Sequence, residues 1–403
     1  MLRPGAWAVL GASLLVGTLG CVSAVSSIEP GARFEREPDE AGLWQAAERL
    51  ERDLEEGGGL SSDVALATYL DGVAARLIGT DLAGTGLTLR VRAVRDPYRS
   101  AFATANGALY VSTGLLASLE NEAQLASVLG HEIAHFTERH LLRQKRIDAS
   151  SEQVAKAGRT LLTAAGAGIG MLALPLVILG DLVVGTGLEA ATTGYSRDLE
   201  READRIGFQR LAGAGYDAPE GARVFTHLRE ELVAEGAEEP FFLGSHPRLA
   251  EREASYAELL QAHGGAEGDV GQDRYAEAIQ SVLLENLRLD LALARRAPAH
   301  AALERHLSHD PSSAEGWYWR GELTRRERGG AALEEAVRHY LRALELAPTH
   351  KEALLALGLL YREQGRDGAA RPYFTRYLAA DPGGVDRELV ASYLEPEGHA
   401  RSR

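Results

Sequence analysis

Hydrophobic positions recur at helical spacing along much of the chain and change to strict alternation in one short region. Residues 43–56 and 62–78 show the helical period, which predicts two helices. Residues 87–94 alternate between apolar and polar side chains, and residues 108–112 form a second short apolar run, so both are predicted strands. We therefore predict an α+β domain that is mostly helical and contains a small sheet.

The last third of the chain carries repeated helical patterns. Residues 351–382 fit a tetratricopeptide unit, which is about 34 residues long. Residues 314–348 fit a second unit with about three additional residues between its helices, and residues 273–311 fit a degenerate one. Each unit buries its faces only against a neighbour, so a stack of three is expected. The pattern predicts an all-α solenoid over residues 273–395.

The N-terminus has the layout of a secretory signal. Arg3 precedes an apolar run at 6–19 that is too short to span a bilayer. Cys21 is the only cysteine, and its place directly after a glycine is similar to a lipoprotein processing site. We expect residues 1–20 to be removed and Cys21 to be lipidated; secretion without a lipid is the alternative.

Composition indicates the remaining boundaries. Residues 21–42 are predicted to be a loose tether, and residues 264–272, which are rich in glycine, a linker. Residues 43–263 between them are expected to form the domain that carries the chemistry.

The formal net charge is −15, and 45% of the residues are hydrophobic. The chain is therefore globular and long enough for at least two domains. Nucleic acids and anionic lipid surfaces bind basic patches, so this charge argues against both as partners. Any membrane attachment is expected to come from the lipid on Cys21.

The most informative residues are His131, Glu132 and His135. They lie on a helix predicted to begin at Asn121 and Gln124, which can form a reciprocal cap. At about 100° per residue, the two histidines lie about 40° apart on one face. Two imidazoles can then reach one cation, with Glu132 beside them as general base. This spacing is typical of zinc hydrolases; packed or solvent-facing histidines are the alternative.

A catalytic zinc needs a third protein ligand and an open position for water. Metzincins carry Gly and His where this chain has Glu138 and Leu141, so we expect the third ligand further along. Glu200 and Asp204 are spaced i, i+4, so one carboxylate can bind metal and the other can hold a ligand histidine. A solvated charged face is the alternative. His140 is turned about 140° from the zinc face of an ideal helix, which favours a structural or supporting role.

Residues 161–180 carry no charge and are long enough to span a bilayer. A single crossing would separate the two histidines from Glu200. A hairpin would need about 40 apolar residues, whereas Pro175 and Asp181 interrupt the run. We expect two short apolar helices that pack on the domain or touch the membrane surface.

The region from 90 to 252 resembles the gluzincin peptidases typified by HtpX and the CAAX prenyl endopeptidases, and in particular a BepA-like subgroup with C-terminal tetratricopeptide repeats. The resemblance rests on residues 106–116, the motif at 131–135, the run at 196–204, and Ser245-His246-Pro247 followed by Arg252. It implies a zincin-type fold with one Zn²⁺ per chain. The implied ligands are His131, His135 and Glu200, with Asp204 as a supporting partner.

The resemblance implies further roles. His246 would either stabilise the oxyanion or occupy the water position as a latch. Arg252, Asn106 and Gly107 are weaker candidates for contacts to substrate or oxyanion, and a surface salt bridge is an equal alternative for Arg252. The strand at 108–112 corresponds to an edge to which an extended substrate would add, with an ordinary core strand as the alternative.

These features predict a zinc metalloendopeptidase in the periplasm, anchored to the outer membrane by lipidated Cys21. Its expected substrates are misfolded or misassembled envelope proteins, and the solenoid would dock protein substrates or the outer-membrane assembly machinery. One alternative is a chaperone or scaffold in which the repeats act and proteolysis is minor. Another is an amidase acting on cell-wall peptides, which would not need a protein-binding solenoid.

Overall fold

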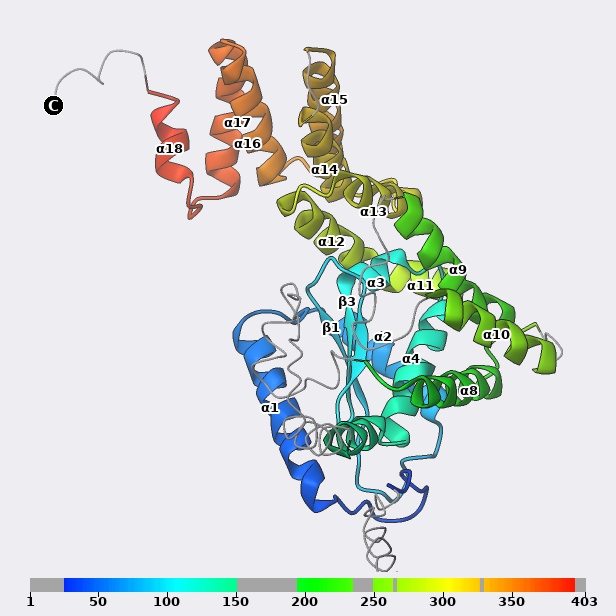
Figure 1. Ribbon diagram of the computed structural model, residues 1–403. Helices are drawn as coiled ribbons and strands as arrows, with labels where there is room; N and C mark the ends of the chain where they lie inside the picture. Colours follow the sequence, from blue (N-terminus) through cyan, green and yellow to red (C-terminus); the bar gives the residue numbers. More distant parts are fainter. Residues whose placement is uncertain (1–24, 151–193, 235–248, 264–266, 327–329, 396–403) are drawn as a thin grey trace, which may run out of the picture.

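The computed structural model describes residues 25–150, 194–234, 249–263, 267–326 and 330–395 (Figure 1). The first elements are η1 (Pro38–Glu40), α1 (Ala41–Glu56), α2 (Val64–Ile78), β1 (Arg90–Val94), β2 (Ala101–Ala103), β3 (Ala108–Ser112), α3 (Thr113–Ser118) and α4 (Glu122–Thr137). The next are α8 (Arg197–Gly213), α9 (Ala218–Ala234), α10 (Leu249–His263), α11 (Gln272–Ala278), α12 (Gln280–Ala292) and α13 (Arg296–His309). The last are α14 (Ala314–Arg325), α15 (Gly330–Leu346), α16 (Lys351–Glu363), α17 (Asp367–Ala380) and α18 (Arg387–Ser392). The predicted α+β class, mostly helical with a small sheet, is confirmed.

The sheet has the strand order β1-β3-β2, with β3 parallel to β1 and antiparallel to β2. Different helices cover its two faces, as Figure 1 shows. Leu109 and Val111 of β3 pack in one core with α2 and α4, whereas Ala108 and Tyr110 pack in another with α1. Every residue of β3 is therefore buried.

The prediction that residues 108–112 form an edge strand is wrong. β3 is the central strand, and the edge strand that contacts α4 is β2. β2 has only three residues, Ala101–Ala103, which is too few to show a period of hydrophobic positions. The sequence pattern therefore did not indicate this strand.

The segment 267–271, in the predicted linker, is bound to the first domain. The Val270 carbonyl accepts a hydrogen bond from Ala123 N over 3.1 Å, and Arg76 donates to the Asp269 carboxylate over 2.8 Å. Beyond this segment, apolar side chains of α11 to α13 belong to the same core as α2 and α4. The core therefore continues across the predicted linker.

Helices α12 to α17 form successive hairpins, in which α12 packs on α13, α14 on α15 and α16 on α17. Gly321 of α14 faces the ring of Tyr340, and Gly358 of α16 faces the ring of Phe374; a Cβ at either glycine would lie 2.5 or 2.4 Å from ring carbon. The same contact thus occurs in both hairpins, as expected for repeated units. Their assignment as tetratricopeptide repeats stays a prediction.

The segment before α1 docks on the C-terminal end of α4. Ile28 N donates to the Thr137 carbonyl over 2.8 Å. The Arg139 guanidinium donates to the Ser26 carbonyl over 3.2 Å and to both carboxylate oxygens of Glu40 over 3.2 and 2.5 Å. Glu40 and Arg139 are buried, so this ion pair lies inside the fold. The expected loose tether is therefore fixed to the domain over these residues.

Some predicted features lie outside the described residues, namely the signal segment, Cys21, the apolar run at 161–180 and His246. Among the helices that the structure describes, none is both long enough and apolar enough to cross a membrane.

Candidate metal centre

Helix α4 carries the His-Glu-x-x-His motif through the middle of the domain. The helix is capped by Asn121, whose side-chain oxygen accepts from Gln124 N over 3.0 Å. All residues of α4 are buried, and His131, Glu132 and His135 are at most 2% exposed. Buried polar side chains need partners, so each of these groups must be accounted for by its neighbours.

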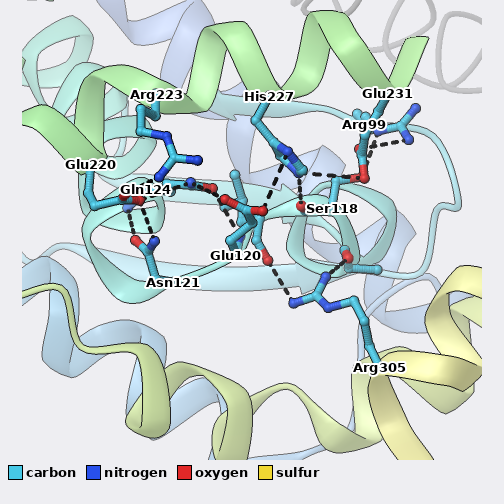
Figure 2. A network of polar contacts seen from close by, with 12 residues as sticks. Arg99, Ser118, Glu120, Asn121, Gln124, Glu220, Arg223, His227, Glu231 and Arg305 are labelled. Carbon is cyan, nitrogen blue, oxygen red and sulfur yellow. Dashed lines mark hydrogen bonds and ion pairs between the residues drawn. The ribbon is translucent and has the colours of Figure 1, made fainter. Parts of the chain in front are cut away.

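Polar contacts from two later helices hold the start of α4 (Figure 2). The Asn121 amide donates to Glu220 of α9 over 2.7 Å. His227, also of α9, bonds the Ser118 carbonyl over 2.8 Å, and Arg305 of α13 donates to the Leu119 carbonyl over 2.8 Å. The turn that precedes the motif helix is thus fixed both by its own domain and by the first helical hairpin.

Helix α8 crosses α4 at a pair of glycines. A Cβ at Gly207 of α8 would lie 2.8 Å from His131 N, and a Cβ at Gly130 of α4 would lie 3.0 Å from the Gly207 carbonyl oxygen. Any larger side chain at this crossing would force the helices apart. The close approach places Glu200 and Asp204, which precede Gly207 on α8, beside His131.

The ligand atoms of His131, His135 and Glu200 all lie within 4.8 Å of one another. The two Nε2 atoms are 2.9 Å apart, and the Glu200 carboxylate oxygens lie 3.5 Å from Nε2 of His131 and 3.6 Å from Nε2 of His135. Two imidazole nitrogens and one carboxylate oxygen form a donor set found around catalytic zinc.

A carboxylate orients the first histidine. Asp204 Oδ1 lies 2.9 Å from His131 Nδ1 and also accepts from Arg252, over 3.1 Å from Nε and 2.8 Å from Nη2. This contact holds the proton on Nδ1 and leaves Nε2 to face the metal position. Arg252 is 4% exposed and is bound to Asp204, so the alternative of a surface salt bridge is wrong, and its expected contact to substrate or oxyanion stays a prediction.

A third histidine orients the second ligand. His140 Nδ1 lies 2.9 Å from His135 Nδ1, and His140 is fully buried. Its position differs from the ideal-helix expectation because α4 ends at Thr137 and Arg139 adopts φ 54°, which turns the chain back. Burial lowers the pKa of His140 to about 4. Its neutral Nδ1 can therefore accept the Nδ1 proton of His135.

These contacts provide a test of whether zinc fits the site. The Nδ1–H of His131 donates to Asp204, and the Nδ1–H of His135 donates to His140. Both Nε2 atoms therefore carry lone pairs, and they lie 2.9 Å apart. Two facing lone pairs beside a carboxylate repel one another unless a cation lies between them. The residues therefore fit a zinc ion.

Tyr195 was not among the predicted site residues. Its ring stacks on the His135 ring, with centroids 4.0 Å apart and an interplanar angle of 19°. Burial, together with the charges of Glu132 and Glu200, raises the pKa of Tyr195 well above its usual range. A phenol that stays protonated thus lies beside both carboxylates. A single aromatic residue before a helix cap carries no pattern in the sequence that would have indicated this position.

Asn106 and Gly107 shape the turn between β2 and β3. The Asn106 side-chain oxygen accepts from Thr104 Oγ1 over 2.8 Å and from Ala108 N over 3.3 Å. Gly107 has φ 83°, and a Cβ there would lie 2.5 Å from the Thr88 carbonyl oxygen. These contacts show that both residues stabilise the turn. Their expected role in contacts to substrate or oxyanion stays a prediction.

Comparison with known proteins gives three informative relatives. The putative beta-barrel assembly-enhancing protease of Vibrio cholerae is 33% identical over 195 residues, which cover 47% of this chain and 38% of that protein. The beta-barrel assembly-enhancing protease of Escherichia coli K12 is 29% identical over 208 residues, covering 49% of this chain and 39% of that one. The metalloprotease YcaL of Escherichia coli K12 is 29% identical over 178 residues, covering 44% and 64%. The chain thus spans about two fifths of the length of the first two relatives.

Among experimentally determined structures, the crystal structure of MamA protein aligns at 16% identity with a TM-score of 0.22, covering 47% of this chain and 91% of that one. This score is too low to indicate a common fold. The model of peptidase family M48 matches residues 65–259, a range that contains β1 to β3, the metal-ligand group on α4 and α8, and Arg252. Over this segment the chain is similar to peptidase family M48, whose members are zinc-dependent metallopeptidases.

Proposed function

We propose that this protein is a zinc-dependent metalloendopeptidase of the cell envelope. The observation that carries the proposal is the group of His131, His135 and Glu200, whose ligand atoms lie within 4.8 Å of one another on two helices that cross at glycines. Glu132 follows the first ligand directly and is equally buried, which is the arrangement expected for a general base beside a metal.

Each side chain has a distinct task in this proposal. A bound zinc ion would act as a Lewis acid that acidifies water and polarises the scissile carbonyl. Glu132 takes the proton of the attacking water and returns it to the leaving amine. Asp204 and His140 hold the two ligand histidines in the required tautomer. Tyr195 keeps the plane of the His135 ring.

The edge strand β2 is the proposed docking strand for substrate. It contacts α4, and the residues that follow it, Thr104 and Ala105, border a small cavity together with His135 and Tyr195. An extended polypeptide that paired with β2 would therefore run past the metal position. Main-chain pairing of this kind needs no particular side chains, which suits unfolded substrates.

The envelope assignment rests on the names of the relatives and on the predicted signal segment. Two relatives are beta-barrel assembly-enhancing proteases, so misassembled outer-membrane proteins are the proposed substrates. A lipid on Cys21 would anchor the protein in the periplasm at the outer membrane, and the helical hairpins would contact substrate or assembly machinery. His246 stays a proposed catalytic residue or latch.

Substitution Glu132→Gln tests the chemistry. We expect it to retain stoichiometric zinc, measured by atomic emission, and to lower cleavage of β-casein, an unfolded protein, by roughly 100-fold or more. Glu138→Gln is the matched control, since Glu138 lies just beyond the C-terminus of the same helix. Wild-type cleavage by the zinc-loaded Glu132→Gln protein would refute the proposed base.

The same assays separate the alternatives. A zinc-loaded wild-type protein that suppresses aggregation of an unfolded protein without cleaving it would instead be a chaperone or scaffold. Cleavage of muropeptides but not of β-casein would indicate an amidase.

A further inference from the structure

The first helices of the last two hairpins enclose a groove. It has a volume of about 240 Å³ and lies between α14 and α16. Its lining, which defines the α14–α16 groove, consists of Tyr318, Glu322 and Arg325 from α14 and Glu352, Leu355, Ala356, Leu359, Leu360 and Glu363 from α16.

The floor of the groove is apolar. Tyr318, Leu355 and Leu359 are each only partly buried, although they belong to helices whose other apolar side chains fill the hairpin core. Tyr318 is further held by the ring of His350, with centroids 5.3 Å apart. These side chains keep apolar surface in contact with water, and a partner that covered it would gain the free energy of burial.

The charges around the floor are mostly negative. Glu322 is neutralised within the fold, because Arg325 donates to both of its oxygens and the Tyr340 hydroxyl lies 2.6 Å from one of them. The side chain of Glu352 is 46% exposed. Glu363 is exposed and has no ion pair with any residue that the structure describes. Two carboxylates on α16 thus face solvent beside the apolar floor.

We propose that the α14–α16 groove binds a segment of a partner protein in which a large apolar side chain lies next to lysine or arginine. The apolar side chain would displace the water over Tyr318 and Leu355, and the basic side chain would pair with Glu352 or Glu363. The acidic rim disfavours nucleic acid and anionic lipid. The groove is also smaller than sites that enclose a small molecule, which are about 300–1,000 Å³.

This inference deepens the proposed function, because it states what chemistry would recruit substrate or machinery to the peptidase, and it rests on that function for its biological meaning. The binding itself does not depend on catalysis.

Fluorescence anisotropy on the full-length, zinc-loaded Glu132→Gln protein tests the proposal without cleavage of the probe. The probe is a fluorescein-labelled Gly/Ser peptide with a central Arg-Leu-Arg, compared with matched peptides that carry Glu-Leu-Glu or Arg-Ala-Arg. We expect saturable binding of Arg-Leu-Arg that weakens with added salt, and at least fivefold weaker binding of the other two peptides. Equal binding of all three peptides, or no binding, would overturn the inference.

Two charge reversals locate the site. Glu363→Lys should weaken Arg-Leu-Arg binding roughly fivefold to tenfold. Glu334→Lys on α15 changes the net charge equally, from an exposed glutamate outside the groove, and should leave binding unchanged. Equal effects of both variants would show non-specific attraction and overturn the site. Cleavage of β-casein by the wild-type protein is measured in parallel. Failure of peptide binding with normal cleavage would refute the groove alone, whereas failure of cleavage would refute the proposed peptidase.

Discussion

Substitution Gly207→Ala tests whether the glycine crossing builds the metal centre. A Cβ at position 207 would lie 2.8 Å from His131 N and 2.9 Å from the Cα of His131, whereas ordinary contact begins near 3.4 Å. These atoms belong to helix backbone and have no rotamer to change, so α8 must move away from α4 by about 0.5 Å. Metal–ligand distances tolerate only about ±0.2 Å. Glu200 and Asp204 are residues of α8 and would move with it.

We expect Gly207→Ala to lower the free energy of unfolding of the metal-free protein by about 1–3 kcal/mol, the usual cost of overpacking. Zinc affinity, measured by competition with a chromophoric chelator, should fall by roughly 10- to 100-fold. Gly213→Ala is the matched control, because Gly213 ends the same helix and no atom lies within 4 Å of a Cβ built there. Wild-type zinc affinity in Gly207→Ala would refute the reasoning that the close crossing positions Glu200.

Three further predictions concern polar groups. His140→Ala should weaken zinc binding roughly 10- to 100-fold in the same chelator assay, because His135 loses the neighbour 2.9 Å away that fixes its tautomer, whereas an unchanged affinity would show that His140 only packs. Arg139→Ala should lower the free energy of unfolding in urea by about 3–5 kcal/mol, because it leaves the buried Glu40 carboxylate without its cation; adding Glu40→Gln should restore part of the loss, and its failure to do so would contradict this cause. Burial alone would raise the pKa of Glu315, but hydrogen bonds from His350, Arg288 and Trp319 lower it to about 2. The ionised form therefore stabilises the fold above about pH 4.5, and this contribution is lost as pH falls toward 2. Glu315→Gln should be about 1–2 kcal/mol less stable at pH 7, after allowance for partial exposure, with a difference that shrinks below pH 4.5; a difference independent of pH would contradict the assignment.

The metal-ligand group could be predicted from the sequence because its geometry is local. His131 and His135 share one helical face, and so do Glu200 and Asp204, so the spacing within each helix was informative. That the two pairs meet depends on Gly207, whose role is visible only when the second helix backbone is in place. In a sequence, an isolated glycine within a helical pattern indicates a lower helix propensity at that position and does not indicate a close contact with another helix.

Other parts of the fold depended on breaks in regular structure. The expectation for His140 assumed an unbroken helix, but the left-handed conformation of Arg139 reverses the chain, and an arginine gives no signal of a positive φ. The strand β2 could not be predicted because three residues are too few to show a period of hydrophobic positions. The glycine-rich composition of 264–272 suggested a linker, although Asp269 is held by Arg76 and Arg274. Each case was decided by tertiary contacts that pattern and composition do not encode.

The docking of Ser26 and Ile28 on the end of α4 has a consequence for the orientation of the protein. Five peptide units separate Ser26 from Cys21, and a fully extended chain covers at most about 18 Å over that distance. If Cys21 carries a lipid, the Arg139 end of the motif helix is tethered within that reach of the bilayer. The metal centre would then work in a thin layer above the membrane surface.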